Sequence, residues 1–296
     1  MRNFKLNYLF EILKSSTKPL NIIYPIPILQ LLIFSQSKHD LNSFISALIF
    51  SFLFYPAVNI WNHVNDVEED ILGGKYNVFA ECNEVKIIGI AISIILYLTS
   101  LAFLIEKNIS LFLYIICLLV TWLYSDKLFF GRIMKRFKDN YITELLSFII
   151  FYPSFTLLIW TFFDSINIKS LAIALTVLFF ILFGVFIKDL RDISGDERAG
   201  LKTLGVVFNP NDLIRFALTC IILYYISIAI FTSLGIYNIY TIIAILPIIL
   251  TIYSIIIIGR RDWIISIETI THFKRILLSN MISIALLIIT GFLSQQ

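Results

Sequence analysis

Two separate stretches of this chain carry acidic side chains at helical spacing, each directly after a long apolar segment. The first covers residues 62–70 and the second covers residues 189–196. An α-helix turns once in 3.6 residues, so side chains three or four positions apart share one face. The first face therefore carries Asn62, Asp66 and Asp70, and the second carries Asp189, Asp192 and Asp196. If the fold brings the two faces together, their oxygen atoms can bind divalent cations.

The chemistry of these two faces favours magnesium. Carboxylates that lie close together repel each other and resist ionisation unless a cation or another partner compensates their charge. Mg²⁺ prefers oxygen ligands, keeps several waters, and is commonly shared between one or two carboxylates and a substrate phosphate. Asn62 adds a neutral oxygen to the first face. A single acidic cluster at a helix end is usually only a solvated boundary, but two such clusters predict a site for two Mg²⁺ ions.

Basic residues lie close to both acidic faces in the sequence. One polar stretch contains Lys127, Arg132, Lys135, Arg136 and Lys138, and the second face is surrounded by Lys188, Arg191, Arg198 and Lys202. The usual basic excess on the cytoplasmic side of a membrane protein explains most of these charges. A metal-bound diphosphate, however, needs carboxylates for its metals and Lys or Arg for its remaining charge. The candidates for binding such a substrate are Lys127, Arg132, Lys188, Arg198 and Lys202.

The composition places this chemistry in a lipid bilayer. Of the 296 residues, 59% are hydrophobic and only 15% are charged, and the mean hydropathy is +0.90. Soluble domains are rarely more than about half apolar, so the composition predicts a polytopic membrane protein. The net charge of +3 is small, and no basic stripe with interleaved aromatic residues is present. Nucleic acid is therefore not an expected partner.

Nine apolar segments are long enough, or nearly so, to cross a bilayer, which takes roughly 20 helical residues. They cover residues 20–36, 43–62, 85–105, 110–125, 143–163, 170–188, 213–235, 238–258 and 275–293. With nine crossings, all of the 23 Lys and Arg residues except Lys38, Lys107 and Lys169 fall on the side of the N-terminus. Because Lys and Arg favour the cytoplasm, we predict an all-α membrane protein with nine transmembrane helices around a central cavity. Its N-terminus is then cytoplasmic and its C-terminus external.

The connections between these segments indicate which side carries the function. The external connections are short, whereas the cytoplasmic ones are long and cover residues 63–84, 126–142, 189–212 and 259–274. Functional residues tend to lie on loops held by a rigid scaffold, and both acidic faces fall on the cytoplasmic side. We expect one domain over residues 1–296, with a four-helix pseudo-repeat at roughly 20–125 and 143–258 followed by a ninth helix.

The two acidic motifs together resemble those of a known family. The pattern NxxxDxxxD at Asn62, Asp66 and Asp70, paired with DxxxD at Asp192 and Asp196, is similar to the motifs of the UbiA superfamily of intramembrane prenyltransferases. The longer stretch over residues 188–204, with its acidic ladder, its glycine and a following Thr-Leu, resembles the second motif of that superfamily. Nine helices with both motifs on the cytoplasmic side also agree with this resemblance, which covers essentially the whole chain.

The resemblance implies a transferase reaction and roles for individual residues. A polyprenyl diphosphate would bind through Mg²⁺ between the motifs, lose its diphosphate, and pass its allylic group to a lipophilic acceptor. The catalytic residues would be Asp66, Asp70, Asp192 and Asp196; Asn62, Asp66 and Asp70 would hold one metal ion, and Asp192 and Asp196 the other. Asn62 and Asp189 would also assist in substrate binding. Tyr124 and Lys127 lie where related enzymes carry a Tyr and a basic residue that contacts the diphosphate.

The identity of the acceptor stays open at this stage. Many members of the superfamily follow the first motif with an Arg-Pro-rich segment, whereas residues 75–82 here read KYNVFAEC. A quinone-precursor ring, a porphyrin-type ring and an archaeal glycerol-phosphate lipid all remain candidates, which would place the protein in lipid or quinone biosynthesis. The expected location is a prokaryotic cell membrane, with the active site facing the cytoplasm.

Two other functions share parts of this pattern. A transporter or cation exchanger could use the acidic motifs as an ion path, but transporters place ionisable groups near the bilayer midplane. Here the acidic residues gather at the cytoplasmic ends of the apolar segments. A soluble isoprenyl diphosphate synthase would use the same metal chemistry, and the hydropathy of this chain excludes it.

Overall fold

The computed structural model describes residues 6–16, 26–37 and 40–293, and this part of the chain is helical. An isolated bridge joins Asn140 and Lys202. The longer helices are α1 (Leu6–Ser16), α3 (Pro27–Gln36), α4 (Leu41–Asn65), α6 (Asn83–Glu106), α7 (Leu111–Ser125), α8 (Tyr141–Trp160), α9 (Ile168–Arg198), α11 (Pro210–Ser233), α12 (Ile248–Gly259) and α13 (Ile267–Leu293). The short ones are α5 (Val67–Leu72), α10 (Leu204–Val207) and the 3-10 turns η1 (Val78–Ala80), η2 (Phe130–Arg132), η3 (Phe137–Asp139) and η4 (Ile239–Ile245).

Seven helical segments in the described residues are long and apolar enough to cross a membrane. They are α4, α6, α8, α9, α11, the segment Ile239–Gly259 formed by η4 and α12, and Glu268–Leu293 of α13. These agree with seven of the nine predicted spans. The other two predictions, 20–36 and 110–125, coincide with the shorter apolar helices α3 and α7. Residues 20–25 of the first of these, and Lys38 of the charge argument, lie outside the described residues.

The direction of α7 matters for the two motifs. Its last residue, Ser125, donates a hydrogen bond of 2.7 Å to Asn62 near the end of α4. α7 therefore returns the chain from the far end of α6 to the end of the bundle where the first acidic motif lies. Its 15 residues extend about 22 Å at 1.5 Å per residue, which is less than the hydrocarbon core of about 30 Å. Nine membrane crossings and the orientation of the termini stay predictions.

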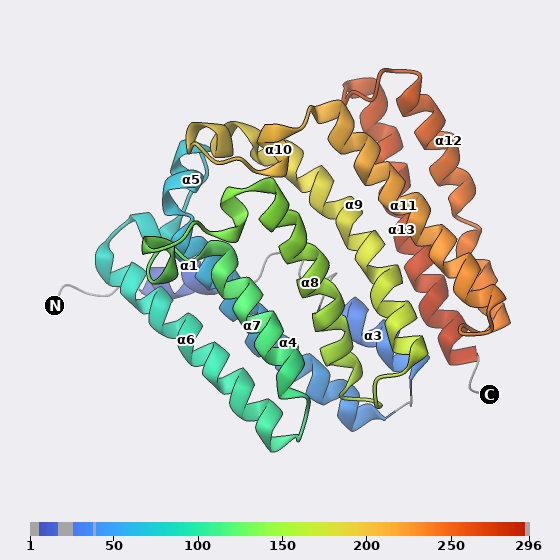
Figure 1. Ribbon diagram of the computed structural model, residues 1–296, viewed down its shortest axis with the longest axis horizontal. Coiled ribbons are helices and arrows are strands. Elements are labelled where there is room, and N and C mark those ends of the chain that lie inside the picture. The colour runs from blue at the N-terminus through green and yellow to red at the C-terminus, as the bar shows by residue number, and fades with distance from the viewer. Residues whose placement is uncertain (1–5, 17–25, 38–39, 294–296) are drawn as a thin grey trace.

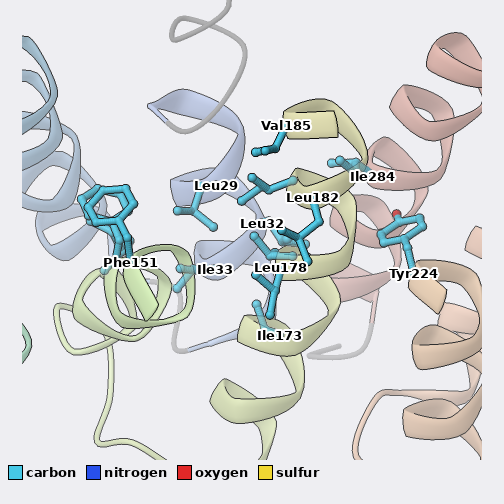
Figure 2. Packing of buried hydrophobic residues seen from close by; sticks show 14 of the residues in the cluster. Leu29, Leu32, Ile33, Phe151, Ile173, Leu178, Leu182, Val185, Tyr224 and Ile284 are labelled. Atoms are coloured by element: carbon cyan, nitrogen blue, oxygen red, sulfur yellow. The ribbon is translucent and has the colours of Figure 1, made fainter. Parts of the chain in front are cut away.

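The helices pack as two flanking groups joined by α3, α8 and α9 (Figure 1). α4 packs on α6 and α7 on one flank, and α11 and α13 pack with α9, η4 and α12 on the other. A large apolar core runs through the centre, and Figure 2 shows residues of α3, α8, α9, α11 and α13 in it, among them Leu32 and Leu182. A smaller apolar cluster joins α1, α4, η1 and α6. This core is the rigid scaffold from which both acidic motifs extend.

The predicted span 238–258 is broken in the middle at Pro247, and the neighbouring helix α13 compensates for the break. A proline removes a backbone donor and leaves carbonyl oxygens of the preceding turn without their helical partners. Ser283 donates a hydrogen bond of 2.6 Å to the carbonyl of Ala244, in the turn before the proline. This carbonyl is thereby satisfied within the protein, as a lipid environment requires. Ser279 adds a hydrogen bond to the carbonyl of Pro247, which also accepts from the backbone of Leu250 and Thr251.

The two acidic faces belong to helix ends of different kinds. α9 begins at a reciprocal cap between Asn167 and Ser170 and continues for 31 residues to Arg198. That is about 46 Å at 1.5 Å per residue, so the end that carries the second face projects beyond the hydrocarbon core. The first face is not a single helix, because α4 ends at Asn65 and α5 begins at Val67. Asp66 links the two helices, because its N–H donates to the carbonyl of Asn62 and its carbonyl accepts from the N–H of Asp70.

Candidate functional site

The two acidic faces line one cavity of about 130 Å³ at one end of the bundle. The lining residues are Asn62, His63, Asp66, Glu69, Asp70, Lys75, Tyr124, Lys138, Glu144, Lys188, Asp189, Asp192, Gly195, Asp196 and Thr203. These come from α4, α5, α7, α8, α9 and the adjoining loops. The cavity is therefore lined by one part of the helical bundle.

A close backbone approach holds the two faces together. A Cβ atom added at Gly195 of α9 would lie 3.1 Å from the Cα atom of Gly73 at the end of α5. Glycine is the residue that permits such an approach. Gly73 caps the end of α5. The next residue, Gly74, has a positive φ of 70°, a conformation that favours glycine and ends the helix. In Figure 1, α5 lies beside the far end of α9, close to α10.

Each residue of the first face has a partner within the protein. The side chain of Asn62 accepts from Ser125, as described above. Lys138 donates a hydrogen bond of 2.6 Å to Oδ1 of Asp66. Thus the loop after α7, which is distant in sequence, supplies a cation to the middle of the first motif.

The third residue of this face, Asp70, is held from the loop that follows α5. Asn77 donates to Asp70 Oδ2 at 2.8 Å, and Nδ1 of His63 lies 3.4 Å from the same oxygen. Burial by itself would raise the pKa of Asp70, but these two hydrogen bonds and the nearby charges of His63 and Lys75 together lower it. Asp70 is therefore a carboxylate at neutral pH.

The second face is also paired with cations and hydroxyl groups. Lys75 donates a hydrogen bond of 2.7 Å to Oδ1 of Asp192, and Nζ of Lys188 lies 3.7 Å from its Oδ2. Thr203 donates a hydrogen bond of 3.0 Å to Asp196. Lys75 follows the first motif by only a few residues, so its contact with Asp192 links the two motifs directly.

A buried acidic pair closes the side of the cavity between α8 and α9. Glu144, in the first turn of α8, accepts from the backbone N–H of Leu204 at 2.8 Å and from the hydroxyl of Tyr124 at 3.4 Å. Asp189 of α9 is only 5% exposed. Its Oδ2 has no hydrogen-bond partner among the residues that the structure describes. A buried carboxylate oxygen without a donor is costly, so this atom is a place where a ligand group can bind.

A salt-bridge network joins α5 to the loop after α7 beside the cavity. Arg136 donates to Glu69 at 2.6 Å, and the two side chains are 4% and 7% exposed. Lys127 reaches Glu68 at 2.7 Å and Glu69 at 3.0 Å. Burial would raise the pKa of Glu69, but the positive charges of Lys138 and Arg136 prevail and lower it to about 2. Glu69 is thus a permanent anion that anchors α5 to the loop after α7.

The structure separates the predicted site residues into two groups. Those that line the cavity are Asn62, Asp66, Asp70, Tyr124, Lys188, Asp189, Asp192 and Asp196. The others, Lys127, Arg132, Arg198 and Lys202, do not line it. Lys127 and Arg198 lie at a hollow on the outer side of α5, where Arg198 donates to the carbonyl of Leu72. Arg132 lies in the exposed turn η2, and the backbone of Lys202 pairs with Asp139.

Several lining residues cannot be singled out from the sequence alone. Lys138 was present in the basic stretch, but its neighbours gave no reason to prefer it to Lys127. Lys75, Glu144 and Thr203 carry no motif of their own, and only the fold brings them to the acidic faces. The sequence does offer one indication for Lys138. This residue lies just before the helix that carries Glu144, where the chain returns to the helical bundle.

The donor set of the cavity fits magnesium. Its two faces offer carboxylate oxygens and one amide oxygen, which are the ligands that Mg²⁺ prefers, and one or two carboxylates are enough when a phosphate completes the shell. No three His, Cys, Asp or Glu side chains in the described part of the chain are grouped closely enough to hold a metal ion as they stand. Lys138 and Lys75 instead donate hydrogen bonds to oxygens of Asp66 and Asp192.

Comparison with known proteins agrees with this geometry. A sequence model of the UbiA prenyltransferase family matches residues 24–273 of the chain. An uncharacterized protein of Archaeoglobus fulgidus is 39% identical over 209 residues, which is 70% of this chain and 72% of that protein. The family match includes both acidic motifs and every residue that lines the cavity. The protein is a multi-pass, all-helical member of the UbiA prenyltransferase family.

Proposed function

We propose that this protein catalyses Mg²⁺-dependent transfer of a polyprenyl group from a prenyl diphosphate to a lipophilic acceptor, with release of diphosphate. The family is one of prenyltransferases, which act on lipophilic acceptors. The observation that carries the proposal for this chain is the single cavity in which both acidic faces and three lysines meet. Carboxylates for metals and ammonium groups for phosphate are the two parts that a diphosphate site requires.

In this proposal the acidic residues bind the metal ions and the lysines bind the diphosphate. Asn62, Asp66 and Asp70 would hold one Mg²⁺, and Asp192 and Asp196 the second. When bound, Mg²⁺ supplies neutralisation of the negative charge that develops on the departing diphosphate. Lys75, Lys138 and Lys188 lie among these carboxylates. Their ammonium groups transfer from carboxylate to phosphate oxygens when the substrate binds, and so hold the diphosphate in place.

The membrane setting follows from the same arrangement. The cavity lies where α9 extends beyond its apolar part and α4 reaches its polar end. The allylic part of the substrate then lies toward the bilayer and the diphosphate toward water. Together with the distribution of Lys and Arg, this arrangement supports an active site on the cytoplasmic face of a prokaryotic cell membrane.

The proposal is tested by a transfer assay on the full-length protein in detergent or nanodiscs. Prenyl diphosphates of several lengths are combined with phenolic, porphyrin-type and glycerol-phosphate acceptors, and both prenylated product and released diphosphate are measured. We expect equimolar product and diphosphate for at least one pair, loss of both with EDTA, and recovery with added Mg²⁺. Absence of product for all pairs, together with Mg²⁺-driven cation uptake into proteoliposomes, would establish a transporter and reject a transferase.

A further inference from the structure

The loop after α7 presents large apolar side chains on the protein surface, outside every predicted span. Residues 129–135 read Phe-Phe-Gly-Arg-Ile-Met-Lys, and all seven are exposed; we name this segment the α7 turn. Ile133 is 88% exposed, and Phe129, Phe130 and Met134 are each about half exposed. Apolar side chains gathered in this way at a surface mark a site of interaction with a membrane or with another protein.

The backbone of the α7 turn is held in place by a buried carboxylate. Asp126 accepts hydrogen bonds from the backbone N–H groups of Leu128 at 2.8 Å, Phe129 at 3.0 Å and Phe130 at 2.8 Å. A Cβ atom added at Gly131 would clash with the carbonyl oxygen of Asp126, so glycine is needed where the chain folds back on itself. The exposed apolar side chains are therefore carried by a well-defined backbone.

Aromatic contacts indicate the level of the α7 turn relative to the bilayer. Trp61 and Trp122 lie four and three residues before the ends of the apolar helices α4 and α7. At 1.5 Å per residue this is about 6 Å and about 4.5 Å along the helix axes. The ring of Phe129 lies 6.2 Å from that of Trp61 and 6.0 Å from that of Trp122. The turn thus folds back beside the ends of two apolar helices, which is the level of the membrane–water interface.

The charges of the α7 turn distinguish a membrane from a protein partner. Arg132 and Lys135 are its only charged residues, and both are exposed. Segments that lie in the membrane interface combine apolar side chains for the acyl boundary with Lys and Arg for anionic headgroups. The composition and the level of the turn therefore both favour lipid as the partner.

We propose that the α7 turn is a membrane anchor that binds anionic phospholipid. Phe130, Ile133 and Met134 insert at the boundary between headgroups and acyl chains, in the leaflet on the side of the acidic motifs. Arg132 and Lys135 bind the phosphate groups of anionic lipids at the same level. This surface is separate from the cavity, and its binding of lipid does not depend on which reaction the cavity catalyses.

The anchor adjoins the salt-bridge network that holds α5. Lys127, two residues before the turn, lies 3.0 Å from a carboxylate oxygen of Glu69. Arg136, the residue directly after the turn, lies 2.6 Å from the same oxygen. A turn held in the interface therefore also fixes α5, and with it the first acidic face, at a defined distance from the lipid headgroups.

Depth-dependent fluorescence quenching tests the anchor on the full-length protein. Ile133→Cys is made together with Cys82→Ser and Cys220→Ser, whereas Cys117 is buried and is left unchanged. The new thiol is labelled with an NBD fluorophore, and the protein is placed in nanodiscs of phosphatidylcholine and phosphatidylglycerol. We expect blue-shifted emission, quenching by lipids brominated in the upper part of the acyl chain, and loss of quenching by aqueous iodide. The matched control is Glu197→Cys, exposed at the end of α9, whose label should be quenched by iodide and not by brominated lipid.

The same label reports the preference for anionic lipid. Brominated phosphatidylglycerol and brominated phosphatidylcholine are compared at equal mole fractions. Each basic residue at a membrane surface enriches anionic lipid about fivefold, so we expect phosphatidylglycerol to be the stronger quencher. Arg132→Gln combined with Lys135→Gln should remove this difference. Arg260→Gln combined with Arg261→Gln, two exposed positions after α12, should preserve it.

Three results would overturn the anchor. Iodide quenching of the Ile133 label as strong as that of the Glu197 label would show that the turn lies in water. Equal quenching by the two brominated lipids would reject the binding of anionic headgroups. Protection from iodide that occurs in native membrane vesicles but not in nanodiscs would show that another protein covers the turn.

Discussion

Gly195 of α9 and Gly73 of α5 pack backbone against backbone, and a Cβ on Gly195 would lie 3.1 Å from the Cα of Gly73. This contact joins two motifs that are more than 100 residues apart in sequence. It also explains why a glycine lies within the second acidic face, directly before Asp196. The contact sets the distance between the two acidic faces, so the proposed metal binding depends on it.

Substitution of Gly195 by Ala should weaken the site. The new Cβ presses on the backbone of α5, and overpacking of this kind costs about 1–3 kcal/mol. We expect a lower unfolding temperature in detergent and a marked loss of prenyl transfer. Gly184→Ala is the matched control, because Gly184 lies in the same helix with no atom within 4 Å of its added Cβ. Equal effects of both variants would show that helix propensity, and not the contact, is responsible.

Removal of the charge of Asp192 or Asp66 should abolish transfer with different effects on stability. The cations that pair with Asp192 are about half exposed, so Asp192→Asn should change the free energy of unfolding by no more than about 1 kcal/mol. Asp66 pairs with Lys138, whose side chain is 9% exposed, so Asp66→Asn should cost about 1–3 kcal/mol. Transfer assays and thermal unfolding measure the two effects. Full activity of Asp192→Asn would contradict the proposed metal site.

Substitution of Lys138 by Met should separate metal binding from diphosphate binding. Lys138 donates a hydrogen bond to Oδ1 of Asp66, and Nη1 of Arg136 lies 3.5 Å from the same oxygen. Removal of Lys138 therefore takes away the nearer of these two cations and makes the oxygen more available to Mg²⁺. We expect tighter binding of Mg²⁺ alone. Binding of a prenyl diphosphate should be at least about tenfold weaker, since a charge-assisted hydrogen bond contributes about 1.5–3 kcal/mol. Calorimetry provides both affinities. Lys135→Met, in an exposed position of the same loop, should leave them unchanged.

The buried pair of Arg136 and Glu69 should be important for folding. Breaking a buried pair on one side leaves an uncompensated charge and costs about 3–5 kcal/mol. We therefore expect Arg136→Met to lower the unfolding temperature strongly, and the double variant with Glu69→Leu to recover part of the loss. The exposed pair of Arg215 and Asp212 is the comparison, and Arg215→Met should have an effect below about 1 kcal/mol. If the double variant unfolds at the same temperature as Arg136→Met, an uncompensated charge is not the cause of the lost stability.

The membrane topology can be tested by chemical labelling. If α3 and α7 cross the bilayer as well as the seven longer helices, both acidic motifs face the cytoplasm. A cysteine in place of Glu197, which is exposed at the end of α9, should then react with a membrane-impermeant reagent only from the cytoplasmic side. A cysteine in place of the exposed Lys75 should behave in the same way. Reaction of these two positions from opposite sides would refute nine crossings.

The helices and the two acidic motifs could be predicted from the sequence because both are local properties. Long apolar segments specify spans wherever they occur, and the spacing of three and four residues places Asp192 and Asp196 on one face. The short segment 110–125 shows the limit of this reasoning. By length alone α7 is a weak candidate for a span, and only the contact of Ser125 with Asn62 shows that it returns to the motif end of the bundle.

Which residues complete the site was decided by the tertiary structure. Lys127 and Lys138 belong to the same basic stretch, yet the path of the loop directs Lys127 to the outer side of α5 and Lys138 into the cavity. The sequence does not indicate that Glu144 and Asp189 lie near each other. They are 45 positions apart and come together only where α8 packs on α9. Spacing determines which side chains share a helix face. The packing of helices distant in sequence determines which faces meet, and that depends on the shapes of the whole core.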